Sequence, residues 1–314
     1  MVARLLLLVS MLAFAAGCAE QKHPPLKVGF NTWPGYEFIY LAQVKGFYEQ
    51  AGVDVKLVEL NSLGDVRRAF ERGQIDIMAS TLVELVIAAE SSGHKLAPIA
   101  ITDASKGADK LISTTSITSL ADLRGKRVGA EPGTVDTLVV AAAMRYANLD
   151  MQSTTFEFAS QDDLIAKIHA GEIDAIQTYP PYATKLLDTP GFHVLFDTQQ
   201  IPDEIFDVLS VKQSLINERN EDLQAFLRAF FQAVDYYFQH PQESAQIMAQ
   251  REGITADEFI EAINSMHIFT ANEQLAALQS PKTEKAIQYT IDVLHTHGWL
   301  ANPATAKDFS IPLK

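Results

Sequence analysis

The sequence contains only one cysteine among its 314 residues. No disulfide can form within one chain, so the fold must rely on its hydrophobic core. Positive charge is also scarce, since 25 lysines and arginines stand against 39 aspartates and glutamates, for a formal net charge of −14. This acidity favours solubility and argues against nucleic acid as a partner.

Motifs of catalysis and metal binding are missing as well. The eight histidines are scattered, and His295 and His297 are spaced so that their rings do not face each other on a helix. There is no zinc-ligand spacing, no glycine-rich phosphate loop and no nucleophile elbow. We therefore expect no catalytic residue, no metal site and no cofactor.

The only long apolar run lies at the amino terminus. Residues 5–16 are apolar, follow Arg4 and end on small residues, which is the layout of a secretory signal. The run is too short to span a bilayer, and nothing later resembles a transmembrane segment. We therefore predict a signal peptide over residues 1–17.

The lone cysteine, Cys18, follows this run directly. Residues 15–18, Ala-Ala-Gly-Cys, are similar to a lipobox, whose cysteine receives a lipid and becomes the first residue of the mature chain. An ordinary thiol behind an uncleaved anchor is the alternative. Residues 18–25 are polar and end in Pro-Pro, as expected for a short tether. We predict a lipoprotein on the periplasmic or extracytoplasmic face of the cell membrane, attached to it through the lipid only.

From Lys27 onward, short apolar runs alternate with amphipathic stretches. This pattern is typical of βα units around a largely parallel sheet and predicts an α/β fold. The expected strands are 27–32, 53–58, 75–79, 98–102, 127–130, 154–158, 175–178 and 193–196. The expected helices are 37–50, 65–72, 82–91, 135–147, 162–170 and 182–187, and the tail from residue 220 should be almost wholly helical.

One pattern occurs twice along the chain. Residues 65–76 and 163–174 both read Asp, seven residues, Gly, a polar residue, Ile, Asp. In each copy a helix would end at a glycine in the left-handed conformation, and a buried strand would follow. The repeat reflects either chance similarity between two αβ turns or two lobes of related build.

Two lobes require crossings, and the extended apolar runs 109–114 and 206–212 are the candidates. The first lobe would then be discontinuous, with residues 26–114 plus 207–314, and the second lobe would span 115–206. Ligands of such folds bind in the cleft, at the carboxyl ends of the strands.

Six short motifs follow one another along the chain: NTWPGY (31–36), YLA (40–42), GFYE (46–49), GQID (73–76), LADLRGKRVG (120–129) and GEID (171–174). This series resembles the substrate-binding proteins of ABC importers, in the branch that serves nitrate, aliphatic sulfonates, taurine and thiamine-precursor pyrimidines. The resemblance runs from about Leu26 to the end of the chain. It implies a type II periplasmic binding protein fold that closes on a small molecule and presents it to the permease and ATPase subunits of an importer.

Carboxylates are the first group of candidate ligand-binding residues. Family members that bind taurine and sulfonates tend to use hydroxyls, amides, backbone N–H groups and sometimes a basic side chain, and the helix N-terminus with Thr134 could act in this way. Glu131 in the same loop would oppose an anion and favour a cationic or nitrogen-rich ligand, such as an amine, amidine or guanidinium compound. Aspartates at strand ends often cap the next turn instead, and Lys106 could neutralise one of them. The three candidates of this kind are Asp103, Asp109 and Asp207.

Aromatic and hydroxyl side chains complete the candidate site. Trp33 and Tyr36 follow the first strand, and Tyr179 follows a strand of the second lobe, so Tyr179 could face Trp33 across the cleft. Such rings can form a wall or hold a cation, although packing at the sheet edge is the alternative. Ser80 and Thr81 begin a helix, where capping is their first expected role.

These features predict a monomeric, non-enzymatic solute-binding lipoprotein that captures a small organic or nitrogenous molecule by cleft closure and delivers it to an ABC importer. A ligand-sensing partner of a membrane receptor would share all of them. An enzyme of thiamine or menaquinone precursor metabolism is a further alternative, because fold alone does not separate binding proteins from enzymes.

Overall fold

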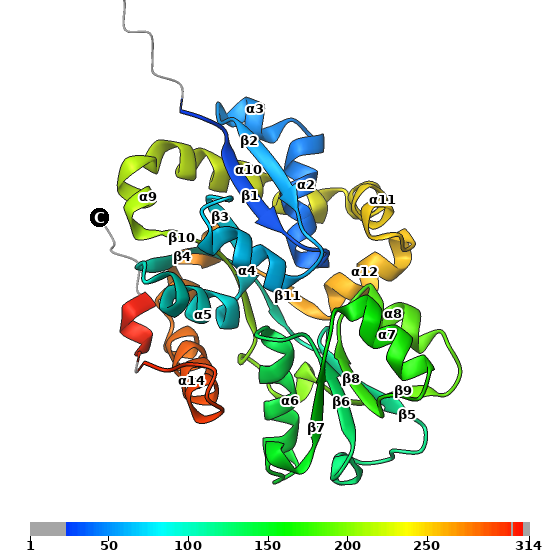
Figure 1. The fold of residues 1–314 in the computed structure, drawn as a ribbon. Helices are drawn as coiled ribbons and strands as arrows, with labels where there is room; N and C mark the ends of the chain where they lie inside the picture. Colours follow the sequence, from blue (N-terminus) through cyan, green and yellow to red (C-terminus); the bar gives the residue numbers. More distant parts are fainter. Residues whose placement is uncertain (1–22, 303, 310–314) are drawn as a thin grey trace, which may run out of the picture.

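A computed structural model describes residues 23–302 and 304–309, which form two αβ lobes (Figure 1). The predicted signal peptide and Cys18 lie outside the described residues. The end of the predicted tether, residues 23–25, is exposed and leads into the first strand. Within the described part of the chain, no helix is both long enough and apolar enough to cross a bilayer.

The first lobe contains a six-stranded sheet with the order β11-β4-β10-β3-β1-β2. Strands β2, β1 and β3 are parallel, whereas β10 is antiparallel to both β3 and β4. The strands are β1 (Leu26–Phe30), β2 (Val55–Glu59), β3 (Ile77–Thr81), β4 (Leu96–Ser105), β10 (Phe206–Lys212) and β11 (Met266–Ile268). The helices of this lobe are α2 (Glu37–Val44), α3 (Phe47–Ala51), α4 (Leu63–Glu71), α5 (Leu82–Ser92), α9 (Gln213–Glu218), α10 (Asn220–Gln239), α11 (Pro241–Glu252), α12 (Ala256–Asn264), α13 (Gln274–Leu278) and α14 (Pro281–Thr296).

The second lobe contains a five-stranded sheet with the order β7-β6-β8-β5-β9. Its strands are β5 (Lys110–Thr114), β6 (Arg127–Ala130), β7 (Thr155–Phe158), β8 (Ala175–Thr178) and β9 (Phe192–Asp197). Its helices are α6 (Val135–Tyr146), α7 (Gln161–His169) and α8 (Tyr182–Leu187).

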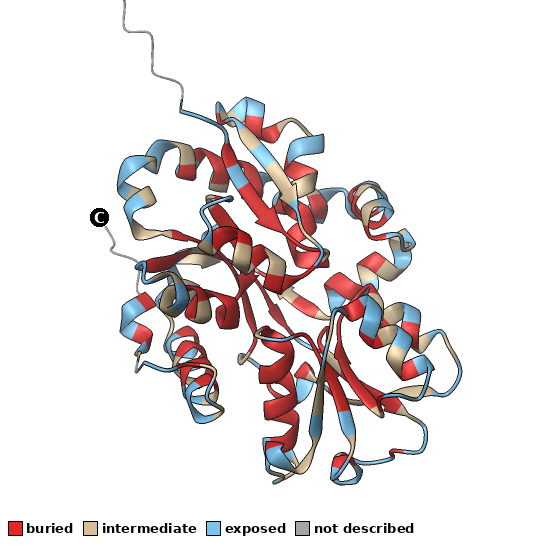
Figure 2. Cartoon of the chain, in the orientation of Figure 1, coloured by how far each residue is buried: buried red, intermediate tan, exposed pale blue. Residues whose placement is uncertain are grey.

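Helix α6 lies between the two lobes. Every residue from Val135 to Met144 is buried (Figure 2), because α6 contacts its own sheet as well as α5 and α14 of the first lobe. A helix that is apolar all round is expected to be buried all round. The amino terminus of α6 is therefore also buried, and its free N–H groups need partners from the protein.

The two predicted crossings are strands instead. Residues 109–114 contribute β5, which pairs with β8 and β9, and residues 206–212 form β10, which lies between β3 and β4. Extended apolar runs satisfy their backbone groups best inside a sheet, so the chain passes between the lobes just before each of these strands. The pairing moves β5 out of the predicted first lobe into the second. The other predicted lobe limits stay a prediction.

The repeated sequence pattern corresponds to two equivalent αβ units. The helices begin at serine caps, Ser62 for α4 and Ser160 for α7. They are followed by Gly73 and Gly171, whose φ angles of 68° and 71° confirm the predicted left-handed caps. The tail is helical as predicted, except that β11 adds a short strand to the edge of the first sheet.

The last aspartate of each pattern holds the unit to a neighbouring parallel strand, β1 in the first lobe and β6 in the second. A carboxylate oxygen of Asp76 accepts the N–H of Lys27 at 2.9 Å, and a carboxylate oxygen of Asp174 accepts the N–H of Arg127 at 2.9 Å. The same bond at the same place in both lobes favours related build over chance similarity.

Candidate functional site

A cavity lies between the lobes, at the carboxyl ends of β1, β3 and β8. It measures about 10 Å³, room for about one water molecule, so the lobes are closed on each other. Both lobes contribute to its wall, which is made by Asn31, Trp33, Tyr36, Leu63, Thr81, Asp109, Val135, Tyr179 and Asp207.

Two aromatic side chains after β1 donate their polar hydrogens to aspartates. The indole Nε1 of Trp33 lies 3.3 and 3.4 Å from the two carboxylate oxygens of Asp103. The Tyr36 hydroxyl donates to Asp207. A Cβ on Gly35 would lie 2.1 Å from an oxygen of Asp103, so glycine is needed at this position for the close approach. The donors of both rings are therefore already used within the protein.

Asp103 and Asp207 form a buried carboxyl pair. They lie directly opposite each other on the antiparallel strands β4 and β10, and facing residues of such a pair project from the same side of a sheet. Burial raises the pKa of Asp103 to about 7, against hydrogen bonds from Thr102 and Trp33 that lower it. Burial, and then the Asp103 charge, raise the pKa of Asp207 well above its ordinary value. Two adjacent buried carboxyl groups do not both ionise readily, so the pair holds a proton near neutral pH.

Asp109 lies between β4 and β5, where the chain passes to the second lobe. Gln177 of β8 donates a hydrogen bond of 3.3 Å to its carboxylate, and burial raises its pKa. The neighbouring Lys110 donates to the carbonyl groups of Gly107 and Ala108, and Lys106 is exposed. Among the described residues, no lysine or arginine lines the cavity.

Tyr179 faces Trp33 across the cleft, which confirms their predicted proximity. The ring centroids lie 5.8 Å apart at an interplanar angle of 76°. The Tyr179 hydroxyl approaches an oxygen of Glu131 at 3.4 Å. This edge-to-face contact is one of the points at which the two lobes meet.

Glu131 and Thr134 organise the loop before α6. Thr134 caps the helix and donates to the carbonyl of Glu131 at 3.0 Å. The Glu131 N–H donates to a carboxylate oxygen of Asp136 at 2.8 Å, and the other Asp136 oxygen has no partner. Burial raises the pKa of Glu131 to about 7, and burial followed by the Glu131 charge raises that of Asp136.

Thr81 has the predicted capping role, whereas Ser80 lies within β3 and does not cap the helix. Ser80 donates to the carbonyl of Thr81, and Thr81 caps α5 together with Glu84. Sequence reasoning missed the further contact of Glu84, whose second oxygen accepts the N–H of Val135 at 3.0 Å, across the cleft. The Thr-x-x-Glu capping box is visible in the sequence, but the partner from the other lobe is not.

The ten predicted ligand-binding residues are all buried at the lobe interface. Contact with a ligand stays a prediction for each of them. The six that line the cavity are Trp33, Tyr36, Thr81, Asp109, Tyr179 and Asp207, and the four that lie behind its wall are Ser80, Asp103, Glu131 and Thr134. The lining residues that were not predicted are Asn31, Leu63 and Val135, and the side-chain oxygen of Asn31 has no hydrogen-bond partner.

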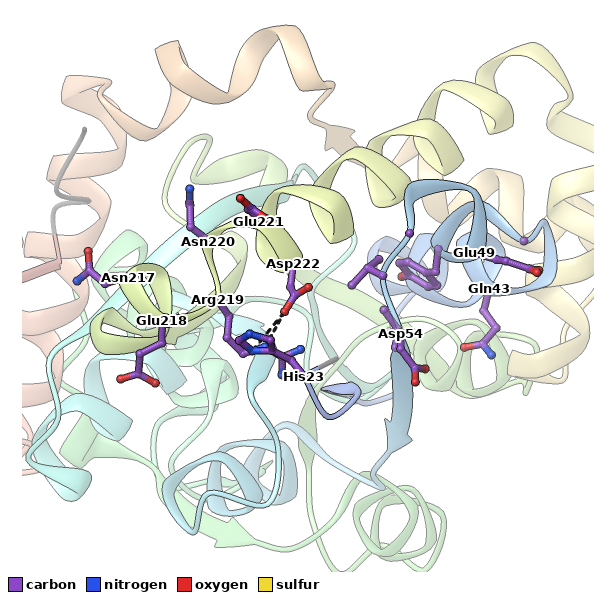
Figure 3. A pocket seen from close by; sticks show the side chains of 15 residues that line it. His23, Gln43, Glu49, Asp54, Asn217, Glu218, Arg219, Asn220, Glu221 and Asp222 are labelled. Atoms are coloured by element: carbon purple, nitrogen blue, oxygen red, sulfur yellow. Dashed lines mark hydrogen bonds and ion pairs between the residues drawn. The ribbon is translucent and has the colours of Figure 1, made fainter. Parts of the chain in front are cut away.

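A larger hollow of about 880 Å³ lies on the first lobe, near the amino ends of β1 and β2 and therefore away from the interlobe cavity (Figure 3). It borders the amino end of β2 and the start of α10, and it contains the ion pair of His23 with Asp222 at 3.8 Å. The polar side chains of this hollow lie at an open surface, whereas those of the interlobe cavity are buried and come from two lobes. A binding site is expected to resemble the interlobe cavity. The described residues form no cluster of three or more potential metal ligands.

The sequence profile of the family described as NMT1/THI5 like matches residues 33–244. The chain belongs to this family. This result confirms the resemblance drawn from the six sequence motifs.

Comparisons with individual proteins agree with this family assignment. The formylaminopyrimidine-binding protein of Halalkalibacterium halodurans is 21% identical, over 97% of each chain. The crystal structure of the periplasmic aliphatic sulphonate binding protein from Escherichia coli superposes with a TM-score of 0.77 at 17% identity, covering 92% of this chain and 98% of that one. A desulfurization enzyme has a TM-score of 0.67 at 14% identity, covering 92% of this chain and 97% of its own. The predicted periplasmic binding protein fold is therefore confirmed.

Proposed function

We propose that this protein is a non-enzymatic extracytoplasmic solute-binding protein, which captures a small molecule by closure of its lobes and delivers it to an ABC importer. The observation that carries this proposal is the closed cavity lined by buried polar and aromatic groups of both lobes. The names of the formylaminopyrimidine- and sulphonate-binding relatives support the same role.

The cargo that fits this cavity is a hydrogen-bond donor of positive charge, or a nitrogen-rich heterocycle. The Trp33 N–H and the Tyr36 hydroxyl already donate hydrogen bonds to Asp103 and Asp207. The remaining acceptor capacity is that of the Asp109 carboxylate, the Asp103–Asp207 pair with its one shared proton, and the unpartnered oxygen of Asn31. Buried acceptors without donors are costly, and a ligand that supplies N–H groups satisfies them.

The aromatic rings favour a ligand that is planar as well as positively charged. Trp33 and Tyr179 stand on opposite lobes, and Tyr36 lies beside Trp33 with its ring centroid 6.5 Å away. A planar amidine, guanidinium or aminopyrimidine could lie against these faces, which also attract cations.

Closure follows from the contacts that join the lobes. Trp33 meets Tyr179, and Glu84 meets Val135, whereas separated lobes would expose these groups. A ligand that contacts both lobes adds to the closed state only and shifts the population toward it. The 10 Å³ cavity requires the lobes to part before a cargo larger than water enters.

We further propose that Cys18 carries a lipid after removal of residues 1–17, so that the short tether keeps the two lobes near the importer. In cells, the unchanged chain should fractionate with membranes, and Cys18→Ser should release it into the soluble extracytoplasmic fraction. An equal distribution of both proteins would contradict the lipid anchor without affecting ligand binding.

The decisive experiment is a ligand panel on purified residues 19–314, with methylguanidinium, aminopyrimidines, methanesulfonate and nitrate. A ligand at 100 times its dissociation constant adds about 2.7 kcal/mol to the unfolding free energy, which a thermal shift detects. We expect stabilisation by the cation or the aminopyrimidines. Asp207→Asn should lower that affinity at least about tenfold, whereas Asp122→Asn, an exposed carboxylate of the second lobe, should not.

The same panel tests the competing functions. Stabilisation by methanesulfonate or nitrate alone would refute the cationic cargo. Recovery of a chemically altered ligand after incubation would refute the non-enzymatic role. Cellular uptake of the labelled ligand should fall when the gene is deleted, and unchanged uptake would contradict delivery to an importer.

A further inference from the structure

The buried amino terminus of α6 is already occupied by a carboxylate of the other lobe. The free N–H groups of a helix N-terminus attract anions. In α6, Thr134 accepts from the second and third residues of the helix, which leaves the N–H of Val135, a residue that lines the cavity. Glu84 accepts this N–H at 3.0 Å. The carboxylate of Glu84 therefore occupies the position at the Val135 N–H that an incoming anion would favour.

Glu84 does more than an ordinary capping residue. Glu258 in α12 forms the same capping box, in which one carboxylate oxygen accepts from the backbone N–H and hydroxyl of Thr255. Glu258 is only partly buried, and its interaction with the other lobe is with the charge of Lys185, whereas Glu84 is fully buried and adds the hydrogen bond from the backbone of Val135. Capping alone requires neither the burial nor the cross-lobe contact.

Burial raises the pKa of Glu84, against hydrogen bonds from Thr81 and Val135 that favour its ionised form. Glu131 and Asp136 lie in the same loop and first turn of α6, and their charges interact with that of Glu84. The guanidinium of Arg67, in the first lobe, approaches Gly133; its Nη1 forms an ion pair with Glu71, and its buried Nε has no hydrogen-bond partner. An anion at Val135 would have the Glu84 carboxylate at hydrogen-bond distance, and two adjacent charges of one sign disfavour each other.

We infer that Glu84 is a specificity-determining residue that excludes anionic solutes by acting as a built-in anion at the amino terminus of α6. This inference rests on the proposed function and extends it, because it assigns the sign of the accepted charge to one side chain. Loss of the Glu84 charge should give the cleft an affinity for small anions that the unchanged protein lacks.

The experiment measures binding of methanesulfonate and of methylguanidinium by calorimetry at constant ionic strength. Glu84→Gln keeps the side-chain volume and Glu84→Ala also frees the Val135 N–H. We expect both variants to bind methanesulfonate at least about tenfold more tightly than the unchanged protein, a difference of about 1.4 kcal/mol, with the larger gain for Glu84→Ala. Glu258→Gln, which alters an equivalent capping box, should show no gain.

A second substitution removes the donor itself. Val135→Pro replaces the first residue of α6, where proline is well tolerated, and Thr134 before it is already extended at φ −129° and ψ 178°. In combination with Glu84→Gln, it should abolish the gain in methanesulfonate affinity. Persistence of the gain would show that the anion binds elsewhere and would overturn the inference.

The outcomes separate the two proposals. Failure of both Glu84 variants to gain methanesulfonate affinity, while the unchanged protein binds methylguanidinium, overturns the role of Glu84 and leaves the cationic cargo in place. Binding of methanesulfonate by the unchanged protein overturns the exclusion of anions, and it overturns the cationic cargo as well when methylguanidinium does not bind.

Discussion

Substitution of Asp103 by asparagine should change how the stability of the protein depends on pH. Asp103 is fully buried, with Asp207 opposite it, the Asp109 charge nearby, and the Trp33 and Thr102 donors against its oxygens. Burial raises its pKa from an ordinary value of 3.8 to about 7. The folded protein therefore binds a proton over a range in which the unfolded chain has released it.

The sign and size of the effect follow from this shift. A raised carboxyl pKa contributes stability that is fully present below about 3.8 and is lost as the pH rises through about 7. Between pH 8 and pH 5, a single group with these two pKa values adds about 2.5 kcal/mol to the unfolding free energy. Asparagine resembles the protonated acid and can keep the Trp33 bond, so Asp103→Asn should fold and lose this gain.

The assay is urea unfolding of residues 19–314 at pH 5 and pH 8, followed by circular dichroism. The unchanged protein should gain more stability on acidification than Asp103→Asn does, by about 2 kcal/mol or more. Asp122→Asn is the control, because hydrogen bonds from Thr118 and Ser119 lower the pKa of this exposed carboxyl and it should not reduce the gain. Equal gains in the unchanged protein and in Asp103→Asn would refute the proton held by the carboxyl pair.

Three further substitutions test the framework of the site. Gly35→Ala places a Cβ 2.1 Å from an oxygen of Asp103 and should cost about 1–3 kcal/mol in thermal unfolding; a neutral result would contradict the need for glycine. Asp76→Ala and Asp174→Ala should each cost about 1–2 kcal/mol in urea unfolding, and a loss in only one lobe would contradict their equivalence. Arg251→Met removes the ion-pair partner of buried Glu37 and should cost about 3–5 kcal/mol at pH 8. This loss should be smaller at pH 5, because the Glu37 pKa of about 7 allows it to neutralise, and a pH-independent loss would contradict that reasoning.

The local elements of the fold were predictable from the sequence because their signals are local. Apolar runs bounded by glycine gave most strands of both sheets, and the two αβ turns ended at Gly73 and Gly171 as expected. Strand pairing is a long-range property, so the same reasoning took 109–114 and 206–212 for connections. Both runs are extended and apolar, but only the neighbouring strands reveal that they belong to sheets.

The same limit applies to the candidate site. Residues at strand ends could be placed near the cleft, and Trp33 and Tyr179 do meet there. The pairing of Asp103 with Asp207 depends on the register of β4 against β10, and the contact of Glu84 with Val135 depends on how the lobes close. Neither contact can be predicted from the residues adjacent to these side chains in the sequence.

The framework of the lobes is repeated more closely than the cleft between them. Ile75 packs over Gly29 of β1 and Ile173 packs over Gly129 of β6, and a Cβ on either glycine would lie 2.2 or 2.7 Å from the isoleucine. These contacts fix how each αβ unit lies on its sheet, and the loops beyond the strands take no part in them. The charge of the cleft is set in those loops and in the first turns of α5 and α6. A structural likeness at 17% identity to a sulphonate-binding protein therefore carries over the two-lobed frame, while a buried carboxylate such as Glu84 can reverse the sign of the ligand without any change to that frame.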